Sequence, residues 1–512
     1  MYRNILDYFE ETVARSPQKA ALLHHDDQMT FAELRQKSKR LADLLYDRFP
    51  GQKNRPVAVF LPKSFGVYVC DIGITYSSNF FSNLDVKTPA ERIGNILQLM
   101  QPLAVLTESK YKAALDQIEG LTSPVIDLSQ IDWDAVPDCE AMLEKQLQGQ
   151  VDTDPMCIIN TSGSTGTPKG VVLNHRSFFD FMQWSFDTFH LKGEEIVGAL
   201  SPVVFDIYDF ELCLMMWKGS TIALLDAEMG AFPAKLMQEM QAKKVSFIFW
   251  VPTIMVNIAN MGLLDRVPLP DLRTVWFAGE VFPTKQFNVW KKHFPQVVFA
   301  NLYGPIEITL DCVYYIVDRD FDESEPLPIG IPCHNTDILI LNDEDKLCGP
   351  NEIGELCVRG TSLAMGYYNN PEKTAAAFVQ NPLNHSYPET IYRTGDLAYT
   401  DDKGLIIFKG RKDSLIKHMG YRIELGEIEH IVVNTLQLVP NCCVVYNYAK
   451  KSITLIYEST QAITGLDIKK ALSQKLPRYM VPTDFLQMDL LPRNTNGKID
   501  RLKLSEMVNN KD

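Results

Sequence analysis

Short apolar runs alternate with segments of helical periodicity through the first 400 residues, and this alternation restricts the possible folds more than any other feature. Four runs have the length and composition of buried strands: residues 57–61, 103–106, 245–251 and 274–277. Between the runs, residues 31–48 and 234–243 place apolar side chains at helical spacing. The alternation predicts an α/β fold with layers of helices around largely parallel sheets.

The charge balance changes near residue 411, which predicts a domain boundary. Residues 1–410 hold 35 Lys/Arg against 53 Asp/Glu, a net charge of −18, whereas residues 411–512 hold 15 against 11, a net charge of +4. Residues 336–360 and 390–410 have the character of antiparallel strands. Because 512 residues exceed one ordinary core, we expect an N-terminal domain of residues 1–411 and a small C-terminal domain of residues 412–512.

Composition argues against several classes of protein. The net charge of −14 disfavours nucleic-acid binding. No apolar run has the length of a membrane span, and the acid-bearing first segment differs from a signal peptide. Ten cysteines show neither metal-type pairs nor a disulfide framework, which is typical of free thiols in a reducing compartment. We therefore expect a cytoplasmic monomer without membrane insertion.

A loop rich in glycine and hydroxyl groups joins two apolar strand candidates. Residues 160–170 read Asn-Thr-Ser-Gly-Ser-Thr-Gly-Thr-Pro-Lys-Gly and lie between the runs 156–159 and 171–173. Glycine lets the backbone turn tightly and approach a ligand, and free amides with hydroxyls form an anion site. The spacing differs from the Gly-x-x-x-x-Gly-Lys-Ser/Thr phosphate loop. The segment predicts a loop for the phosphates of a nucleotide, with a generic hairpin as the alternative.

Further motifs follow in a fixed order. Residues 303–307 read Tyr-Gly-Pro-Ile-Glu and combine an aromatic face, a turn and an acid that could hold Mg²⁺. Residues 392–396 read Tyr-Arg-Thr-Gly-Asp and place an acid where it could accept ribose hydroxyls. Residues 410–413 (Gly-Arg-Lys-Asp), followed by 417–424, and residues 496–501 (Asn-Gly-Lys-Ile-Asp-Arg) complete the series. Each motif alone is a common surface turn, but together they indicate one family.

The motifs resemble those of the adenylate-forming (ANL) superfamily, and the whole chain is similar to its amino-acid adenylation enzymes. Residues 29–34 and 84–93 agree with this resemblance, and the size and layout resemble free-standing D-alanine–carrier-protein ligases. The resemblance implies a large N-terminal α/β domain of five layers with a small β-barrel, and a small mobile α+β C-terminal domain. It also implies ATP and Mg²⁺ as cofactors and a separate phosphopantetheinyl carrier protein as partner.

The same resemblance assigns the nucleotide site. The phosphates would be held by Thr161, Ser162, Gly163, Ser164, Thr165 and Gly166. The adenosine would be bound by Gly279, Glu280, Asn301, Tyr303, Gly304, Asp396 and Arg411. Glu307 would position Mg²⁺ and, with Thr165 and Lys498, would form the catalytic set. Lys498 would lie between the substrate carboxylate and the α-phosphate, where two anions must be neutralised.

Two further residues are assigned by position in the motifs. Asp413 would be the hinge about which the C-terminal domain turns, bringing the loop at Gly420 and Tyr421 to a pantetheine tunnel. Ile306 stands where the family usually has a threonine that contacts the α-phosphate. Since a hydrogen bond to a charged group stabilises by about 1.5–3 kcal/mol, Ile306 predicts a lower turnover.

Residues 205–211 resemble the segment that opens the amino-acid pocket. Asp206 matches the carboxylate that pairs with the α-ammonium group, and a buried acid without such a partner would be costly. The other implied pocket residues are Ile207, Phe210, Phe249, Trp276, Ala278, Leu302, Leu310 and Asp311. The bulky members predict a shallow apolar pocket for a small side chain. Asp311 is discordant: it points away, holds water or pairs with a polar substrate group.

We therefore predict a ligase that activates a small amino acid with ATP to aminoacyl-AMP, releases pyrophosphate, and transfers the aminoacyl group to the thiol of the carrier. D-Alanine leads glycine, L-alanine, serine and a β-amino acid as the substrate. An acyl- or aryl-CoA ligase is the alternative, and Asp206 argues against it. A third candidate is a non-catalytic protein of this fold, but such a protein would not need both Glu307 and Lys498. A fourth is an oxidative, light-emitting relative, with which a carboxylate at Asp206 agrees poorly. Cell-wall acid esterification and nonribosomal peptide assembly are both possible pathways.

Overall fold

Two large, mostly parallel sheets form the first part of the chain in this computed structural model, which describes residues 2–161, 168–323, 325–412, 415–459, 463–493 and 499–509. The strands of the seven-stranded sheet are, in order, β18 (Gly366–Tyr367), β8 (Lys169–Asn174), β7 (Pro155–Thr161), β4 (Phe80–Asn83), β3 (Pro56–Val59), β5 (Val105–Thr107) and β6 (Val125–Asp127). Those of the nine-stranded sheet are β15 (Ile331–Pro332), β14 (Val313–Ile316), β13 (Val298–Tyr303), β12 (Thr274–Phe277), β11 (Phe247–Trp250), β9 (Ile196–Ala199), β10 (Thr221–Leu224), β1 (Ala20–His24) and β2 (Asp27–Thr30).

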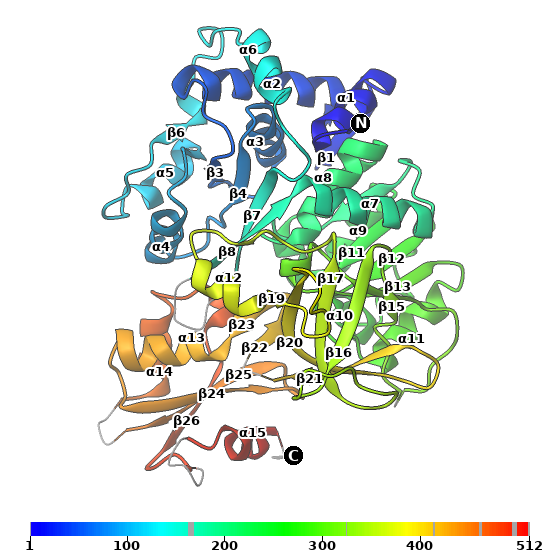
Figure 1. The fold of residues 1–512 in the computed structure, drawn as a ribbon, viewed down its shortest axis with the longest axis vertical. Helices are drawn as coiled ribbons and strands as arrows, with labels where there is room; N and C mark the ends of the chain where they lie inside the picture. Colours follow the sequence, from blue (N-terminus) through cyan, green and yellow to red (C-terminus); the bar gives the residue numbers. More distant parts are fainter. Residues whose placement is uncertain are drawn as a thin grey trace.

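Helices cover both faces of each sheet. Alternate side chains of a strand point to opposite faces, and because both sets are apolar in these strands, both faces must be covered. In β11, Phe247 and Phe249 join the core between the sheets, whereas Ile248 and Trp250 join the outer core. The middle layer holds α1 (Ile5–Arg15), α2 (Phe31–Arg48), α3 (Phe65–Tyr76), α7 (His175–Phe189) and α8 (Asp206–Lys218). The outer layers hold α4 (Ala90–Met100) and α5 (Ser109–Leu115) on one side, and α9 (Pro233–Ala242), α10 (Pro252–Asn260) and α11 (Thr284–His293) on the other. The expected five-layered α/β arrangement is therefore confirmed (Figure 1).

The expected helix over residues 31–48 has a clear local cause. The Thr30 side chain accepts from the Glu33 amide at 3.2 Å, and the Glu33 carboxylate accepts from the Thr30 amide at 2.8 Å. This reciprocal capping box satisfies backbone donors that have no partner inside α2. Two short helices remain, α6 (Glu140–Leu147) and α12 (Pro371–Ala377), and Leu143 of α6 joins the core between the sheets. No helix in the described ranges combines the length and apolarity that a membrane crossing requires.

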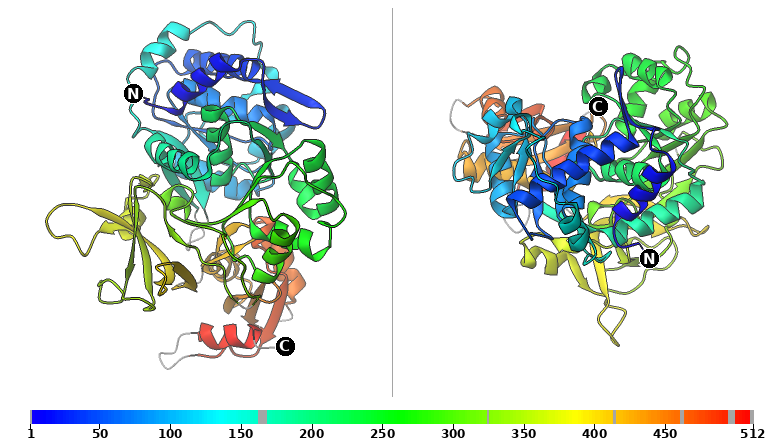
Figure 2. Two further views of the ribbon diagram at one scale, coloured as in Figure 1. Left: turned by 90° about the vertical axis from the view of Figure 1, so that its right-hand side faces the viewer. Right: turned by 90° about the horizontal axis from the view of Figure 1, so that it is seen from above.

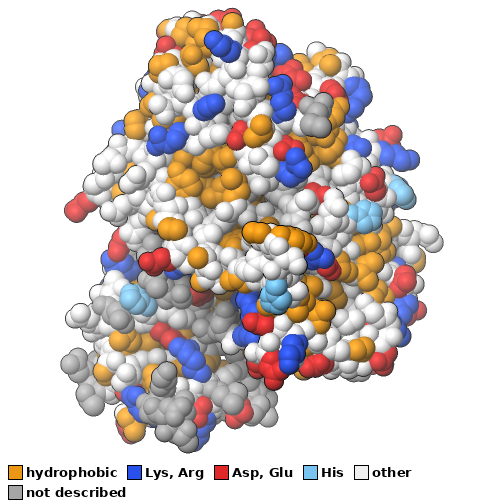
Figure 3. Space-filling model, viewed as in Figure 1, with side chains coloured by type: hydrophobic (Ala, Val, Ile, Leu, Met, Phe, Trp, Pro, Cys, Tyr) orange, Lys and Arg blue, Asp and Glu red, His pale blue; other side chains and the backbone are white. Residues whose placement is uncertain are grey.

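A five-stranded antiparallel sheet follows where the resemblance implies a small barrel. Its strands are β16 (Thr336–Leu341), β17 (Gly354–Gly360), β19 (Phe378–Gln380), β20 (Thr390–Thr400) and β21 (Ile406–Arg411). β20 pairs with β17 along one edge, and with β19 and then β21 along the other. The antiparallel pairing agrees with the expectation for residues 336–360 and 390–410. On the face seen in Figure 3, acidic and basic side chains are interspersed.

The last part of the chain has hydrophobic clusters of its own. Its elements are β22 (Leu415–His418), β23 (Tyr421–Glu424), α13 (Leu425–His430), β24 (Asn441–Asn447), β25 (Ser452–Glu458), α14 (Gly465–Leu472), β26 (Asp484–Met488) and α15 (Arg501–Asn509). Figure 2 shows this part at the end of the molecule farthest from α1 and α2. The separate clusters support a domain boundary near residue 411, which we retain as a proposal.

Candidate active site

A cavity lies where the carboxyl ends of strands from both large sheets meet the hairpin β22–β23. Crevices at the carboxyl ends of parallel strands are the usual ligand sites of α/β folds. The cavity has a volume of about 130 Å³. The sheets contribute Asn83, Thr161, Phe249, Ala278 and Gly304 to its wall, and the hairpin contributes Lys417, Gly420, Tyr421 and Arg422. The hairpin therefore closes one side of the cavity.

The predicted phosphate loop is the connection of an antiparallel hairpin. β7 and β8 pair in register up to Thr161 opposite Lys169, and Thr161 lines the cavity. Several predicted residues lie outside the described residues: Ser162, Gly163, Ser164, Thr165, Gly166, Asp413 and Lys498. The Lys169 ammonium reaches the Glu424 carboxylate of β23 at 3.0 Å. Lys169, which follows the loop at the start of β8, thus connects this hairpin to β23 in the C-terminal part of the chain.

The predicted adenine-binding residues already have partners within the chain. The Glu280 carboxylate accepts from the Gly420 amide at 3.0 Å and from the Thr253 amide at 3.2 Å. The Asn301 side-chain amide donates to the Pro328 carbonyl at 2.8 Å. Gly279 and Gly304 line the cavity. Their adenine role stays a prediction, and Glu280 additionally anchors the hairpin.

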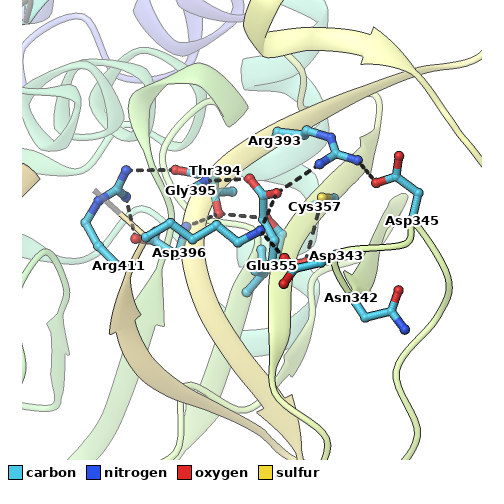
Figure 4. A network of polar contacts seen from close by, with 12 residues as sticks. Asn342, Asp343, Asp345, Glu355, Cys357, Arg393, Thr394, Gly395, Asp396 and Arg411 are labelled. Atoms are coloured by element: carbon cyan, nitrogen blue, oxygen red, sulfur yellow. Dashed lines mark hydrogen bonds and ion pairs between the residues drawn. The ribbon is translucent and has the colours of Figure 1, made fainter. Parts of the chain in front are cut away.

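Asp396 is buried and belongs to a network of polar contacts that also includes Arg411, Thr394 and Glu355 (Figure 4). Its carboxylate forms an ion pair with Arg411 and accepts from the Tyr303 hydroxyl. Arg411 also donates to the Thr394 carbonyl at 3.0 Å, and the Thr394 hydroxyl donates to the Leu356 carbonyl at 2.7 Å. Burial, with the nearby Asp396 charge, raises the pKa of Tyr303 and keeps its hydroxyl a donor. The network fixes three predicted nucleotide-site residues against one another.

Glu307 does not fit a metal ion in this arrangement. Its carboxylate is fully buried, and one oxygen accepts from the Tyr367 hydroxyl at 2.8 Å while the other accepts from Arg422 Nη1 at 2.6 Å. Burial alone would raise the pKa of Glu307, but the Arg422 charge and the Tyr367 hydrogen bond outweigh burial and hold the pKa below its usual value. The chain itself thus neutralises the carboxylate, and the Mg²⁺ role stays a prediction that this arrangement does not support.

The predicted amino-acid pocket is partly brought together around the cavity. Six residues line the cavity: Asp206, Ile207, Phe249, Ala278, Leu310 and Asp311. The other three, Phe210, Trp276 and Leu302, are buried behind the wall. The Phe210, Phe249 and Trp276 rings pack at centroid distances of 5.0–5.7 Å. This aromatic cluster closes the floor, which agrees with a shallow pocket.

Two carboxylates share this pocket with one lysine. Asp206 accepts from the Ile207 amide at 2.9 Å, and burial raises its pKa to about 6 against the opposing charge of Lys417. Asp311 is only 4% exposed, and no described residue donates to its carboxylate. Burial and the neighbouring Asp206 raise the pKa of Asp311 well above its usual value. Asp311 lines the cavity, and the three alternatives for its role stay predictions.

Sequence reasoning assigned no role to four charged residues that build this site. Arg422 and Lys417 bring cations from the hairpin, Lys169 binds Glu424, and Arg92 forms a buried ion pair with Glu427 of α13. All four lie in motifs whose resemblance to the family is evident, so position in a motif was the available signal. Their partners are distant in sequence and gave no signal.

Comparison with known proteins decides the family. Residues 9–368 match the model of the AMP-binding enzyme family. The chain belongs to that family. Its predicted membership of the adenylate-forming superfamily is thereby confirmed. In fold, this AMP-binding enzyme is similar to the adenylation domain AlmE of Vibrio cholerae in complex with glycyl-adenosine-5'-phosphate (TM-score 0.84, 20% identity, 99% of this chain and 98% of that chain). It is also similar to the amide bond synthetase McbA of Marinactinospora thermotolerans (TM-score 0.85, 17% identity, 99% and 100%).

Curated relatives of this AMP-binding enzyme include several proteins that are named as synthases. Gramicidin S synthase 2 of Brevibacillus brevis is 30% identical over 98% of this chain, which spans only 11% of that protein. The chain spans 8% of Tyrocidine synthase 3 of Brevibacillus parabrevis, so it corresponds to about a tenth of such proteins. Zwittermicin A synthase ZmaJ of Bacillus cereus is 28% identical and matches over 98% of this chain and 95% of its own length.

Proposed function

We propose that this AMP-binding enzyme activates a small amino acid with ATP to aminoacyl-AMP and pyrophosphate, then transfers the aminoacyl group to the phosphopantetheine thiol of a separate carrier protein. Asp206 carries the proposal, because its carboxylate lines the cavity above an aromatic floor. An ammonium group entering the cavity would neutralise that carboxylate, as buried charges require. D-Alanine leads glycine, L-alanine, serine and a β-amino acid as the substrate.

Relatives support both parts of the proposal. AlmE is described as bound to glycyl-adenosine-5'-phosphate, the adenylate of a small amino acid. Another protein of similar fold is described as containing adenylation and PCP domains, with a TM-score of 0.82 and 22% identity. We propose ATP and Mg²⁺ as cofactors, with Thr161 and the loop that follows it holding phosphates. Asp396, fixed by Arg411 and Tyr303, would receive the ribose.

The arrangement described here corresponds, in our proposal, to the transfer step. Gly420 and Tyr421 line the cavity, as expected for a pantetheine passage. Phe205 lies against the Tyr421 ring at 4.6 Å, and the Tyr479 ring stacks on Tyr421 at 3.5 Å. These aromatic contacts hold the hairpin over the cavity. For adenylation, the C-terminal domain would turn about Asp413 and deliver Lys498 to the carboxylate and the α-phosphate.

An ATP–pyrophosphate exchange panel tests this function. We expect the strongest exchange with one of the five small amino acids, and loss of exchange in Lys498→Ala by more than about 100-fold, since the lysine would stabilise developing charge. Arg359→Gln, which removes a surface arginine paired with Asp337 and Glu389, is the control and should exchange normally. Unchanged exchange in Lys498→Ala, or strongest exchange with a large aromatic acid, would refute the proposal.

An acyl- or aryl-CoA ligase is the second candidate, because it would share the adenylation step and the same cavity. Asp206 separates the two functions, since a carboxylate that lines the cavity repels a carboxylic-acid substrate that has no ammonium group. The test is to supply CoA and a simple carboxylic acid without a carrier protein. Formation of the thioester would favour the acyl- or aryl-CoA ligase over the amino acid–carrier protein ligase.

A further inference from the structure

Two histidines and an aspartate meet at the end of the nine-stranded sheet, apart from the residues that line the cavity. His24 ends β1, His25 begins the turn to β2, and Asp226 follows β10. His24 Nε2 lies 2.9 Å from Asp226 Oδ1, and His25 Nε2 lies 3.5 Å from Asp226 Oδ2. One ligand atom of each residue lies within 4.8 Å of the other two. Each carboxylate oxygen thus faces a different imidazole.

Strand pairing brings these residues together. β1 and β10 are parallel neighbours, with Leu22 opposite Ile222 and Leu23 opposite Ala223. Both strands therefore end at the same edge of the sheet, which places Asp226 beside the β1–β2 turn although 202 residues separate it from His24. The Lys243 ammonium donates to the His25 carbonyl and holds the turn. The geometry comes from regular structure, so the three side chains are positioned in advance.

The spacing suits a tetrahedral ion. Zinc binds imidazole nitrogen and carboxylate oxygen at about 2.0–2.2 Å, so two ligand atoms of one tetrahedron lie about 3.3 Å apart. His24 Nε2 lies 2.9 Å from one Asp226 oxygen and His25 Nε2 lies 3.5 Å from the other, both close to that value, so small side-chain shifts would bring the ligand atoms around one ion. The His25 side chain is 57% exposed, which leaves room for water as a fourth ligand. Two imidazoles with one carboxylate suit zinc and similar divalent transition metals better than Mg²⁺ or Ca²⁺.

An ordinary ion pair elsewhere in the chain provides the contrast. His293 Nε2 meets the Asp265 carboxylate at 2.8 Å, and its Nδ1 meets the Val289 carbonyl at 2.7 Å. There one imidazole satisfies one carboxylate, and its second nitrogen has a backbone partner. At Asp226 two stacked imidazoles, with ring centroids 4.2 Å apart, converge on one carboxylate. A single histidine would suffice for an ion pair, so the second needs another explanation.

We propose that His24, His25 and Asp226 bind one divalent ion of the zinc class. The ion ties the β1–β2 turn to the end of β10 and stabilises that edge of the sheet. None of the three residues lines the cavity described above. Zinc binding is therefore independent of the proposed aminoacyl chemistry, and its test needs no substrate.

Metal titration of the full chain tests the site. After chelator treatment and removal of the chelator, Zn²⁺ is titrated by calorimetry and Co²⁺ by visible absorption. We expect one ion bound with a Kd at or below about 10 µM, and a Co²⁺ spectrum of tetrahedral type. His25→Ala and Asp226→Asn should each weaken this binding at least tenfold, because each removes a direct ligand. His293→Ala, which removes the ordinary ion pair, is the matched control and should bind normally.

Thermal unfolding gives a second readout. An ion that binds only the folded protein raises Tm as its concentration rises above Kd. Zn²⁺ should therefore raise the Tm of the unmodified protein and of His293→Ala, but not of His25→Ala. Since His25 is largely exposed, His25→Ala should fold, and its Tm without metal checks this. Equal Zn²⁺ affinity in all four proteins, or no binding at 100 times the expected Kd, would overturn the proposal.

Discussion

Asp206 and Asp311 line the cavity, Glu307 is buried next to the wall residue Ile306, and the hairpin β22–β23 brings a cation near each of these three acids. Glu307 is fully buried, yet its pKa is held below the usual value because Arg422 and Tyr367 bind its carboxylate. Asp206 has a pKa raised to about 6, and the pKa of Asp311 is raised further by burial and by Asp206. Glu307 and Asp311 are both buried, yet their pKa values are shifted in opposite directions.

The difference lies in the source of the counter-charge. A buried carboxylate needs an opposite charge or hydrogen-bond donors to stay ionised. The chain supplies both to Glu307, whereas Asp206 and Asp311 share the charge of Lys417 and receive no side-chain hydrogen bond from a described residue. Glu307 thus binds the hairpin through its ion pair with Arg422. The aspartates have capacity left for a cationic ligand, which is the electrostatic basis of the proposed substrate site.

Asp206→Asn should have the largest effect, because it removes the charge that would receive the α-ammonium. Losing one partner of a buried charge pair costs about 2–5 kcal/mol. We expect KM for the amino acid to rise by about 100-fold or more, with KM for ATP nearly unchanged. ATP–pyrophosphate exchange with each substrate varied in turn separates the two constants. A parallel rise in both constants would contradict a specific ammonium site.

Arg422→Gln should have the second largest effect, because it removes the ion pair between the hairpin and Glu307. It leaves Glu307 with Tyr367 alone, and a charge-assisted hydrogen bond stabilises by about 1.5–3 kcal/mol. Since Arg422 holds the hairpin over the cavity, we expect transfer to the thiol to slow by about 30-fold while adenylation changes little. Single-turnover transfer from preformed aminoacyl-AMP measures this step. Arg359→Gln is again the control, and equal slowing of both steps would contradict a role in docking.

Acid should weaken amino-acid binding. The pKa of Asp206 in the folded protein, about 6, lies above its ordinary value of 3.8, so Asp206 is ionised above pH 6 and gains a proton as the pH falls through 6. Only the ionised form can pair with the ammonium group. We expect Kd for the amino acid to rise up to tenfold per pH unit below 6 and to level off above 7, as measured by calorimetry. The dependence should be absent in Asp206→Asn.

The layers and the loop positions could be predicted because they depend on local patterns. Periodicity located α2 and both strands around the phosphate loop, and the motif order indicated the family. The predicted ends of strands differ from the structure by at most two residues, because the apolar pattern has no sharp limit there. The predicted strand at residues 103–106, for example, corresponds to β5 at Val105–Thr107. The helical spacing at residues 234–243 corresponds to α9 at Pro233–Ala242.

The charges of the site could not be predicted in the same way. Arg422 and Glu307 are 115 residues apart, and Lys169 and Glu424 are 255 apart. Their pairing depends on how the C-terminal part lies on the sheets, which no local pattern encodes. Which of the predicted pocket residues reach the cavity surface also depends on packing between distant parts of the chain. Phe210 and Trp276 belong to the predicted pocket, but packing against Phe249 places them behind its surface.

Asp311→Asn makes the same chemical change as Asp206→Asn, on a neighbouring acid, and should have the smallest effect. Burial and the neighbouring Asp206 raise the pKa of Asp311 well above its usual value, so the environment favours the neutral form of Asp311. An amide closely resembles a protonated carboxyl group in shape. We therefore expect KM for a monoamino acid to change by less than about threefold, with the acid limb of the pH profile still centred near 6.

The contrast between the two variants decides what Asp311 does. If the natural substrate carried a second cationic group, Asp311 would be ionised in the complex, and Asp311→Asn would lose affinity for that substrate by the factor of about 100 expected for Asp206→Asn. Calorimetry with D-alanine and with 2,3-diaminopropionate on both variants distinguishes these cases. A large loss confined to the diamino acid would show that both aspartates bind substrate charge. Equal, small effects on both ligands would leave Asp206 as the ammonium receptor and Asp311 as a neutral wall of the pocket.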